Sequence, residues 1–236
     1  MTKIEPIEKL FNKYKYNYSE INKIIIGKRY CAIKLKNGNI GVCATLKKVY
    51  DFDLEQLKNP DTNNYNHRIF IAAYYNAKLN YDNYSDKNTN IIKNILDAKY
   101  KNIVMIGHFK PILQTLEDNN VKVALFDYLN NDPRVLPQNQ QKEYLKKSDA
   151  VILSATSIYN NTFLDITENT SDKCDIFVLG PSSLMHPEIF DYKNIKASYG
   201  TIFKNNDNEI LEMIHQGDGT RTFMKYAKKA VFRLQS

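Results

Sequence analysis

Four short apolar runs in the second half of the sequence constrain the fold more than any other feature. The runs are IVMIGH (103–108), VALFDY (123–128), AVILSA (150–155) and DIFVLG (175–180). Segments with helical spacing at 111–118 and 141–147 lie between them. Apolar runs that alternate with amphipathic helices predict a parallel sheet with helices on its faces.

The rest of this region extends the same pattern. We expect a short helix near 162–166, a strand at 197–203, and helices at 209–217 and 223–231. The fold class is therefore predicted to be α/β. Residues 86–236 are expected to form a Rossmann-like domain, with a mostly parallel sheet and helices on both of its faces.

The first part of the chain predicts a separate, smaller α+β domain. Lys36-Asn37-Gly38-Asn39 lies between two strand-like runs, and Asn-Gly is a strong signal for a hairpin turn. The predicted elements are an amphipathic helix over 5–16, strands at 30–35 and 40–46, and a helix over 67–79. The polar segment 80–90 indicates a linker, so the small domain is predicted to span residues 1–85.

Charge distribution narrows the possible partners. The net charge is +7, but residues 1–97 carry 16 Lys and Arg against 10 Asp and Glu, whereas residues 98–236 carry 17 against 16. No basic helix or aromatic stacking motif accompanies the excess. We therefore expect a solvated lysine surface and no nucleic-acid partner.

The cellular context follows from what the sequence lacks. Three scattered cysteines, without CxxC or zinc-finger spacing, indicate a reducing compartment. The charged N-terminal segment does not have the apolar core of a secretory signal. No run approaches the roughly 18 apolar residues of a membrane span. We expect a cytoplasmic protein without a membrane span.

Polar, ligand-capable residues follow every predicted strand of the larger sheet. In an open parallel sheet, ligands bind outside the carboxyl ends of the strands, so these residues are the candidate site. The candidates from the strand ends are Gly107, His108, Lys110, Asp127, Thr156, Ser157, Asn160, Thr162, Gly180, Pro181, Ser182 and Ser183. Helix capping and turn formation are the alternative explanation for the hydroxyls and amides among them.

The loop after the first of these strands could bind an anion. Pro111 suits a first helical turn, where free backbone amides and the Lys110 cation would face the ligand. Asp127 lies 20 residues after Gly107, where a dinucleotide fold often places its ribose-binding acid. The loop has a single glycine in place of GxGxxG, so an ordinary strand–helix turn remains the alternative.

Two histidines are candidates for proton transfer or metal binding. His108 and His186 follow predicted strands, and either could act as a base or a metal ligand. Asp127 is the other candidate for proton transfer. A structural role for each histidine is the alternative. The sequence contains no P-loop, HExxH, GxSxG or EF-hand motif, which argues against those enzyme and calcium-binding classes.

One further glycine-rich motif, Gly217-Asp218-Gly219-Thr220, precedes the last predicted helix. It could form a nest of backbone amides for an anion. It could equally stop one helix and start the next.

Several of these motifs together resemble a known family. The order SDAVILSATSIYNNTF, then IFVLGPSSLMHPEIF, then a late Gly-Thr and QGDGT, resembles the C-terminal domain of the putative heavy-metal chelation family. The front half, including IAAYYNAKLN, resembles its usual partner, a domain like the N-terminal domain of enolase. The resemblance implies a cleft between the two domains. The residues that it implies for the site are Asn76, Gly107, Asp127, Thr156, Asn160, Thr162, Gly180, Pro181 and Ser182.

One residue departs from the family pattern. Ala155 stands where the resemblance leads us to expect glycine. Because alanine resists positive φ, we expect either a differently shaped loop or a ligand held less closely.

Three functions are consistent with the sequence. The first is a small-ligand-binding protein with an interdomain site that binds or handles a heavy metal or metal chelate. The alternative is an enzyme of the transferase or lyase type, acting on a small anionic or nucleotide-like substrate. A structural interaction module is the third. The expected partner is a small molecule or metal, and homo-oligomers are possible.

Overall fold

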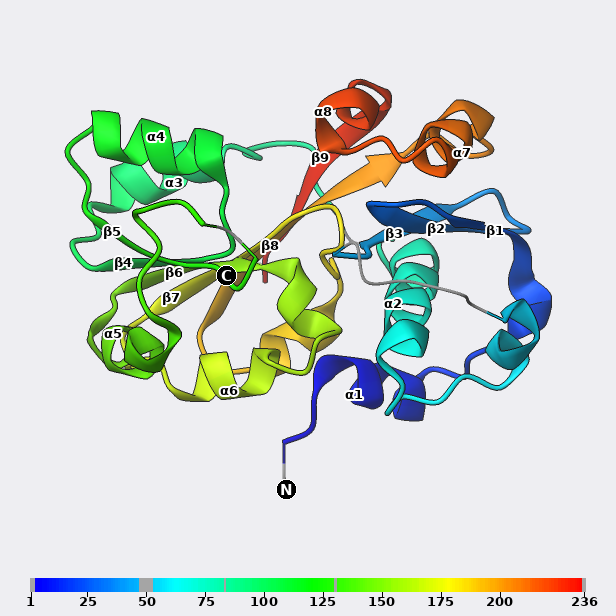
Figure 1. The fold of residues 1–236 in the computed structure, drawn as a ribbon, viewed down its shortest axis with the longest axis horizontal. Helices are drawn as coiled ribbons and strands as arrows, with labels where there is room; N and C mark the ends of the chain where they lie inside the picture. Colours follow the sequence, from blue (N-terminus) through cyan, green and yellow to red (C-terminus); the bar gives the residue numbers. More distant parts are fainter. Residues whose placement is uncertain (1–2, 47–52, 83, 130, 235–236) are drawn as a thin grey trace.

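Two β-sheets lie side by side in the computed structural model, which describes residues 3–46, 53–82, 84–129 and 131–234 (Figure 1). One sheet has three antiparallel strands in the order β1-β2-β3, and the other has six in the order β5-β4-β6-β7-β8-β9. All strand pairs of the larger sheet are parallel except β8 with β9. The predicted α/β fold class, a small mixed unit followed by a mostly parallel sheet flanked by helices, is confirmed.

The parallel strands of the larger sheet correspond to the segments predicted as strands from the sequence, whereas β9 does not. The strands of this sheet are β4 (Ile103–Ile106), β5 (Val123–Phe126), β6 (Ala150–Ser154), β7 (Asp175–Leu179), β8 (Ile195–Phe203) and β9 (Ala227–Phe232). β4 to β7 are mostly buried. Continuous burial explains why they appear in the sequence as unbroken apolar runs.

Alternate residues of these strands face two different layers of helices. Ile103 and Met105 face α3 (Ile91–Ala98) and α4 (Lys110–Asp118). Val104 and Ile106 face the opposite side, which also holds the buried residues of α5 (Gln141–Lys147) and α6 (Phe163–Glu168). The period-2 alternation of a strand therefore gives each helical layer its own apolar surface.

The smaller sheet packs against an alanine-rich helix. Its strands are β1 (Ile21–Ile26), β2 (Tyr30–Leu35) and β3 (Ile40–Ala44), and the helix is α2 (Tyr65–Leu79). A Cβ placed on Gly41 would lie 2.1 Å from the carbonyl oxygen of Ala73. The helix backbone therefore approaches β3 closely, which requires both the glycine and the small side chains of α2.

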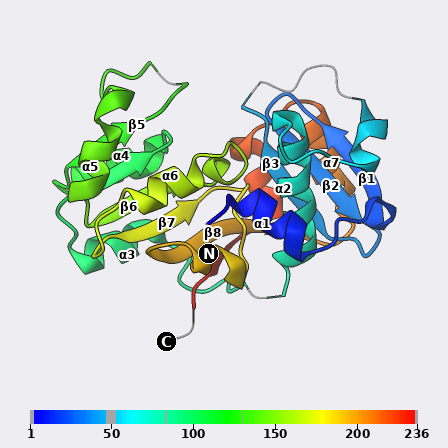
Figure 2. The same cartoon turned by 90° about the horizontal axis from the view of Figure 1, so that it is seen from below.

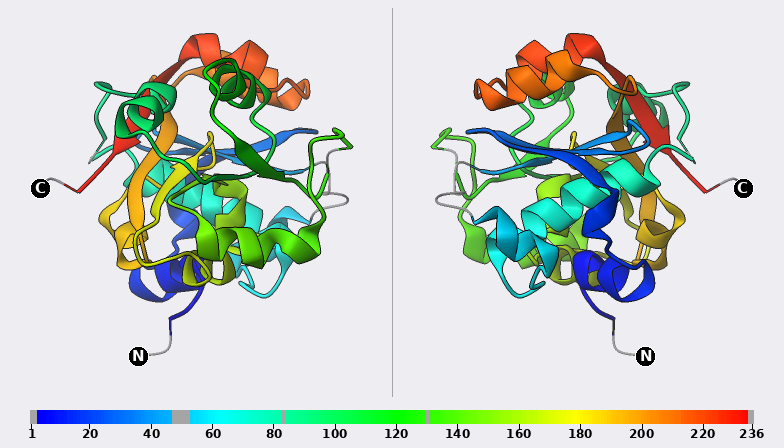
Figure 3. Two further views of the ribbon diagram at one scale, coloured as in Figure 1. Left: turned by 90° about the vertical axis from the view of Figure 1, so that its left-hand side faces the viewer. Right: turned by 90° about the vertical axis from the view of Figure 1, so that its right-hand side faces the viewer.

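The C-terminal part of the chain covers the other face of the smaller sheet. Phe203, α7 (Asn208–His215) and α8 (Thr220–Phe223) form an apolar cluster with β2 and β3 residues such as Val42. Figure 3 shows the small sheet between these helices and α2. Packing therefore crosses the predicted boundary at residue 85, and the division into two domains stays a prediction.

The helix predicted over 223–231 is wrong. The chain forms α8, a 3₁₀ turn at Met224–Tyr226, and then β9, which pairs antiparallel with β8. Ala230 and Val231 are buried in this pairing, whereas Lys228 and Lys229 are exposed. Long-range pairing with β8 overrides the local preference of this lysine- and alanine-rich segment for a helix.

Other elements depart less from expectation. β1 and α3 were not predicted, and the helix expected over 5–16 is shorter, as α1 (Pro6–Lys13). α1 lies near the junction of the two sheets (Figure 2). The remaining 3₁₀ turns are Tyr18–Glu20, Leu54–Lys58, Gln138–Gln140, Ala155–Ile158 and Pro187–Asp191.

None of the helices in the described part of the chain combines the length and apolar character needed to cross a membrane.

Candidate functional site

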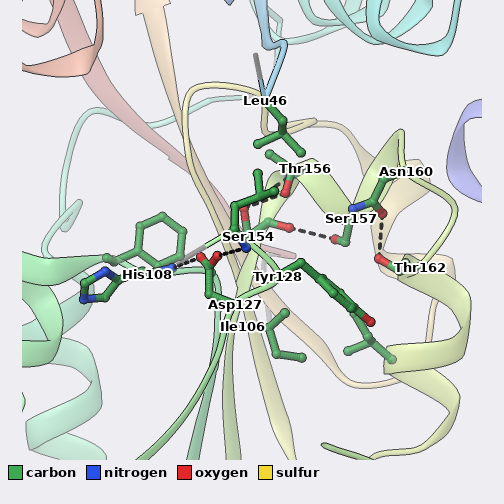
Figure 4. Close-up of a pocket in the computed structure, with 14 residues that line it drawn as sticks. Leu46, Ile106, His108, Asp127, Tyr128, Ser154, Thr156, Ser157, Asn160 and Thr162 are labelled. Atoms are coloured by element: carbon green, nitrogen blue, oxygen red, sulfur yellow. Dashed lines mark hydrogen bonds between the residues drawn. The ribbon is translucent and has the colours of Figure 1, made fainter. Parts of the chain in front are cut away.

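A cavity of about 240 Å³ lies at the carboxyl ends of β4, β5 and β6 (Figure 4). Ser154, Thr156, Ser157, Asn160 and Thr162 form its polar wall, and all five come from one stretch that begins in the last residue of β6. Gly107 and Asp127 line it from the ends of the two neighbouring strands. Strand ends far apart in sequence therefore converge on one hollow.

The strand order explains why the cavity forms at this place. From β4 the chain passes to β5 on one side, and from β5 it crosses to β6 on the other side of β4. Adjacent strands whose connections leave in opposite directions produce a crevice at their carboxyl ends. Gly107, at φ +99°, ends β4 in this crevice, and a Cβ there would lie 2.7 Å from Cβ of Ser154. Glycine is needed both for the backbone angle and for the close approach to β6.

The carboxylate of Asp127 ties two loops of the cavity together. One oxygen, Oδ2, accepts the backbone N–H of His108 at 2.8 Å, and Oδ1 accepts that of Leu129 at 2.7 Å. A carboxylate has about four lone-pair directions, so each oxygen retains capacity to accept a hydrogen bond from a ligand. Asp127 is half-buried, at a position where such a ligand group could reach it.

The segment from Ser154 to Thr162 presents hydroxyl and amide groups to the cavity. Oγ of Ser154 lies 2.9 Å from Oγ1 of Thr156, and Oγ1 of Thr162 donates to Oδ1 of Asn160 at 2.6 Å. Thr156, Asn160 and Thr162 are half-buried. These local bonds orient the side chains without using all of their hydrogen-bonding capacity, since each amide and hydroxyl can form several.

This segment is held in place from the smaller sheet's side. Arg68, a buried residue of α2, donates from Nε to the carbonyl oxygen of Tyr159 at 2.6 Å. Its Nη1 donates to the carbonyl oxygens of Thr62 and Asn63 at 3.1 and 2.9 Å. One guanidinium thus joins the start of α2 to the polar wall, and a buried donor of this kind is costly to remove.

A carboxyl group adjoins the far end of the polar wall. Both oxygens of Glu5 lie 3.3 Å from the backbone nitrogen of Leu164, in the first turn of α6. Burial raises the pKa of Glu5 to about 7, although the bond from Leu164 and the charge of Arg68 act in the opposite direction. The Glu5 carboxyl therefore changes charge near neutral pH, and it contacts the backbone of Leu164, two residues after Thr162.

The apolar walls of the cavity were not predicted from the sequence. They comprise Leu46, Ile106, Phe109, Tyr128, Leu129 and Ile166. Leu46 reaches the cavity from the segment after β3, so the smaller sheet contributes to the site (Figure 4). Tyr128 and Leu129 are among the most exposed large apolar side chains, at 69% and 56%. Tyr128 directly follows Asp127 and could have been found by position, whereas Leu46 required the three-dimensional fold.

The side chain of His108 turns away from the polar wall. Figure 4 shows its imidazole on the far side of the loop from Thr156 and Asn160. Its Nε2 lies 3.6 Å from Oδ2 of Asp132, which in turn pairs with Arg134 at 2.8 Å. The backbone amide of His108, donating to Asp127, is the part of the residue that shapes the site. A proton-transfer role for His108 stays a prediction.

The two histidines proposed as metal ligands lie apart. His186 does not line the cavity; its ring packs edge-on against Tyr14, with centroids 5.4 Å apart, and burial lowers its pKa. Within the described residues, no three His, Cys, Asp or Glu side chains come together in a way that could hold a metal ion. Tight binding of a bare heavy-metal ion needs three or four such donors.

Asn76, Ser182 and Ser183 lie outside the cavity, in a buried seam between the two sheets. Nδ2 of Asn76 donates to the carbonyl oxygens of Val42 and Ser182 at 3.1 and 3.0 Å. Oγ of Ser182 accepts the N–H of Ala44 at 2.9 Å, and Oγ of Ser183 donates to the carbonyl of Tyr199 at 2.7 Å. These groups are engaged by the protein itself.

Asn80 extends the same seam by one helical turn. Its Nδ2 donates to the carbonyl oxygen of Ser183 at 2.8 Å, and its Oδ1 accepts the N–H of Met185 at 2.7 Å. Asn80 was assigned to the polar linker in the sequence analysis, but it is 2% exposed. Its hydrogen bonds fasten α2 to the segment after β7.

The other sequence candidates lie near the cavity without lining it. Lys110 is exposed in the first turn of α4, and Gly180 turns the chain after β7 at φ +134°, followed by half-buried Pro181. Ala155, where glycine was expected, begins the 3₁₀ turn after β6 and is not among the residues with positive φ. Alanine is therefore compatible with the loop as it is shaped here.

Comparisons with known proteins place this architecture among relatives. The sequence profile of a family described as "Putative heavy-metal chelation" matches residues 90–233. Two similar crystal structures are described as proteins with unknown function from the DUF364 family. That from Pyrococcus horikoshii has a TM-score of 0.76 at 21% identity, covering 91% of this chain and 93% of its own. That from Desulfitobacterium hafniense has a TM-score of 0.78 at 15% identity, covering 96% and 97%. No curated protein matches the sequence.

Proposed function

The chain belongs to the putative heavy-metal chelation family, and from this premise we propose that it binds a heavy metal as a preformed chelate, in the cavity at the ends of β4, β5 and β6. The observation that carries the proposal is the composition of the polar wall. Ser154, Thr156, Asn160 and Thr162 offer hydroxyl and amide groups. Such groups recognise an organic ligand by hydrogen bonding and are poor ligands for a soft metal ion.

The absence of a donor cluster supports a complex over a bare ion. No group of three His, Cys, Asp or Glu suited to a metal is present in the described part of the chain. In a chelate, the organic partner supplies the metal's ligands, and the protein needs only to match the outer surface of the complex. Ligand sites of this kind are mostly apolar with a few placed polar groups, as in this cavity.

The arrangement of the cavity supports the expectation of an interdomain site. Leu46 approaches from the smaller sheet, while Gly107, Asp127 and the segment 154–162 approach from the larger one. A ligand held here would contact both parts of the molecule. Binding would therefore stabilise their contact as well as each part.

One observation favours the alternative function. Asp127 ends the strand after Gly107 and has accepting capacity left on both oxygens. A dinucleotide fold uses an acid at this place for ribose hydroxyls. A nucleotide-like substrate, acted on by a transferase or lyase, would use Asp127 in the same way and Asn160 for its polar edge.

Thermal unfolding with added ligands separates the two functions. We expect iron(III), nickel(II) and copper(II) complexes of citrate and nitrilotriacetate to include at least one that raises the Tm, while the bare ions do not. The variants Thr156→Val and Asn160→Leu should fold and lose this shift. A Tm raised by a nucleotide or S-adenosylmethionine, with no response to any chelate, would contradict chelate binding and support the enzyme.

A further inference from the structure

A second hollow adjoins the cavity and differs from it in charge. It has a volume of about 420 Å³ and is lined by Arg29, Tyr30, Ala44, Leu46, Leu129, Gly219 and Thr220. Leu46 and Leu129 also line the first cavity, so the two hollows share a wall. A ligand in the first cavity that extends past these two side chains would enter the second.

The cation in this second hollow is Arg29. It lies in the turn between β1 and β2 and is exposed. Its Nη1 lies beside Gly219, where an added Cβ would come within 2.7 Å of it. No ion pair with Arg29 is formed by any carboxylate in the described ranges, and Asp218, although next to Gly219, does not line the hollow. The guanidinium offers donors suited to a carboxylate or phosphate.

The motif Gly217-Asp218-Gly219-Thr220 has a structural role that leaves this site open. Gly217, at φ +87°, follows α7, and Gly219 precedes α8, as a helix stop and start. With no side chain at Gly219, the Arg29 guanidinium can lie directly against the backbone. The motif shapes the hollow, and Arg29 supplies its charge.

Groups of opposite charge therefore line the two adjoining hollows. Asp127 accepts hydrogen bonds in the first cavity, and Arg29 offers donors in the second hollow. We propose, building on the proposed function, that the ligand carries an oxyanion, a carboxylate or a phosphate, which Arg29 binds in the second hollow. Another part of the same ligand would present hydrogen-bond donors to Asp127.

A matched pair of variants tests the Arg29 site independently of the natural ligand. Arg29→Gln removes the guanidinium, and Lys28→Gln makes the same change in charge one residue away, at an exposed side chain that does not line the hollow. The probes are inorganic phosphate and citrate, each titrated separately by calorimetry. We expect the wild type to bind at least one probe, Arg29→Gln to bind it about tenfold more weakly, and Lys28→Gln to remain within about twofold. The preferred probe identifies the oxyanion as a phosphate or a carboxylate.

The outcomes separate this inference from the proposed function. Equal weakening in both variants would show only general attraction to a basic surface and overturn the inference, as would absence of binding of either probe to the wild type. A metal chelate bound equally well by wild type and Arg29→Gln would overturn it while the proposed function stands. Arg29-dependent binding of phosphate or citrate, with no chelate bound, would support the oxyanion site and refute chelate binding.

Discussion

The seam between the sheets and the wall of the cavity are built from the same residue types but use them differently. In the seam, Asn76 is 4% exposed and gives both of its amide hydrogens to carbonyl oxygens of two separate segments. In the wall, the side chain of half-buried Asn160 accepts a hydrogen bond from nearby Thr162 and lines a cavity. An asparagine or serine in a loop can therefore either hold two segments together or bind a ligand. Which of the two it does depends on whether protein or a cavity faces it, and a single sequence does not reveal that.

The largest expected effect comes from breaking the seam. In Asn76→Ala, the carbonyl oxygens of Val42 and Ser182 both lose their donor in a buried place. Each such group costs about 1–3 kcal/mol, so we expect a loss of roughly 3 kcal/mol in the free energy of unfolding. Urea denaturation measures this. Asn66→Ala, on the same helix, is the control and should lose less than about 1 kcal/mol.

The same seam shows where inference from the sequence succeeded and where it failed. The parallel strands of the larger sheet and the convergence of Gly107, Asp127, Thr156 and Asn160 were predictable, because parallel strand ends meet at one edge. Ser182 also follows a strand, yet it bonds to Ala44 of the smaller sheet. Its role depends on how the two sheets pack, and periodicity does not encode that packing.

Other elements were hidden for a related reason. β9 has a lysine- and alanine-rich sequence, and only its pairing with the long β8 makes it a strand. Leu46 enters the cavity from a distant part of the chain. The pairing of β9 joins residues more than twenty positions apart, and Leu46 meets residues of the other sheet. Local sequence pattern encodes neither contact.

A smaller effect is expected at the edge of the seam. Ser182→Ala leaves the half-buried N–H of Ala44 without the oxygen that accepts it at 2.9 Å. We expect the free energy of unfolding to fall by about 1–2 kcal/mol. Since Ser182 does not line the cavity, binding of any chelate should be unchanged in the fraction that is folded. If the variant were as stable as the wild type but had lost chelate binding, Ser182 would belong to the binding site and not to the seam.

Glu5, at the end of the polar wall beside Leu164, makes the stability of the protein depend on pH. Glu5 has its pKa raised from 4.5 to about 7, so the folded state binds the proton more tightly than the unfolded chain. The resulting stability is fully present below pH 4.5 and is lost as the pH rises through 7. Allowing for partial exposure, the loss is about 1–2 kcal/mol.

Replacing Glu5 isolates this contribution. Glu5→Gln keeps an oxygen for the N–H of Leu164 but does not titrate. We expect the Tm of the wild type to fall relative to that of Glu5→Gln between pH 5 and pH 8. Parallel Tm curves for the two proteins over this range would show that the carboxyl is solvated and leaves its pKa near 4.5.

The smallest effect on stability is expected in the wall itself. Thr156→Val preserves the shape of the side chain and removes a half-buried hydroxyl that bonds to Ser154. We expect a change below about 1 kcal/mol in urea denaturation. A loss as large as that of Asn76→Ala would mean that the hydroxyl fastens the loop, and the contrast between wall and seam would fail.

The most direct test of ligand binding in the cavity is to titrate the chelate that raises the Tm most into two variants, one altered in the wall and one in the seam. Asn160→Leu alters the wall and Ser182→Ala alters the seam, and calorimetry gives the Kd for each. We predict that Asn160→Leu weakens binding at least tenfold while Ser182→Ala stays within twofold of the wild type. Equal affinity in Asn160→Leu and the wild type, or a loss confined to Ser182→Ala, would contradict the assignment of ligand binding to the cavity.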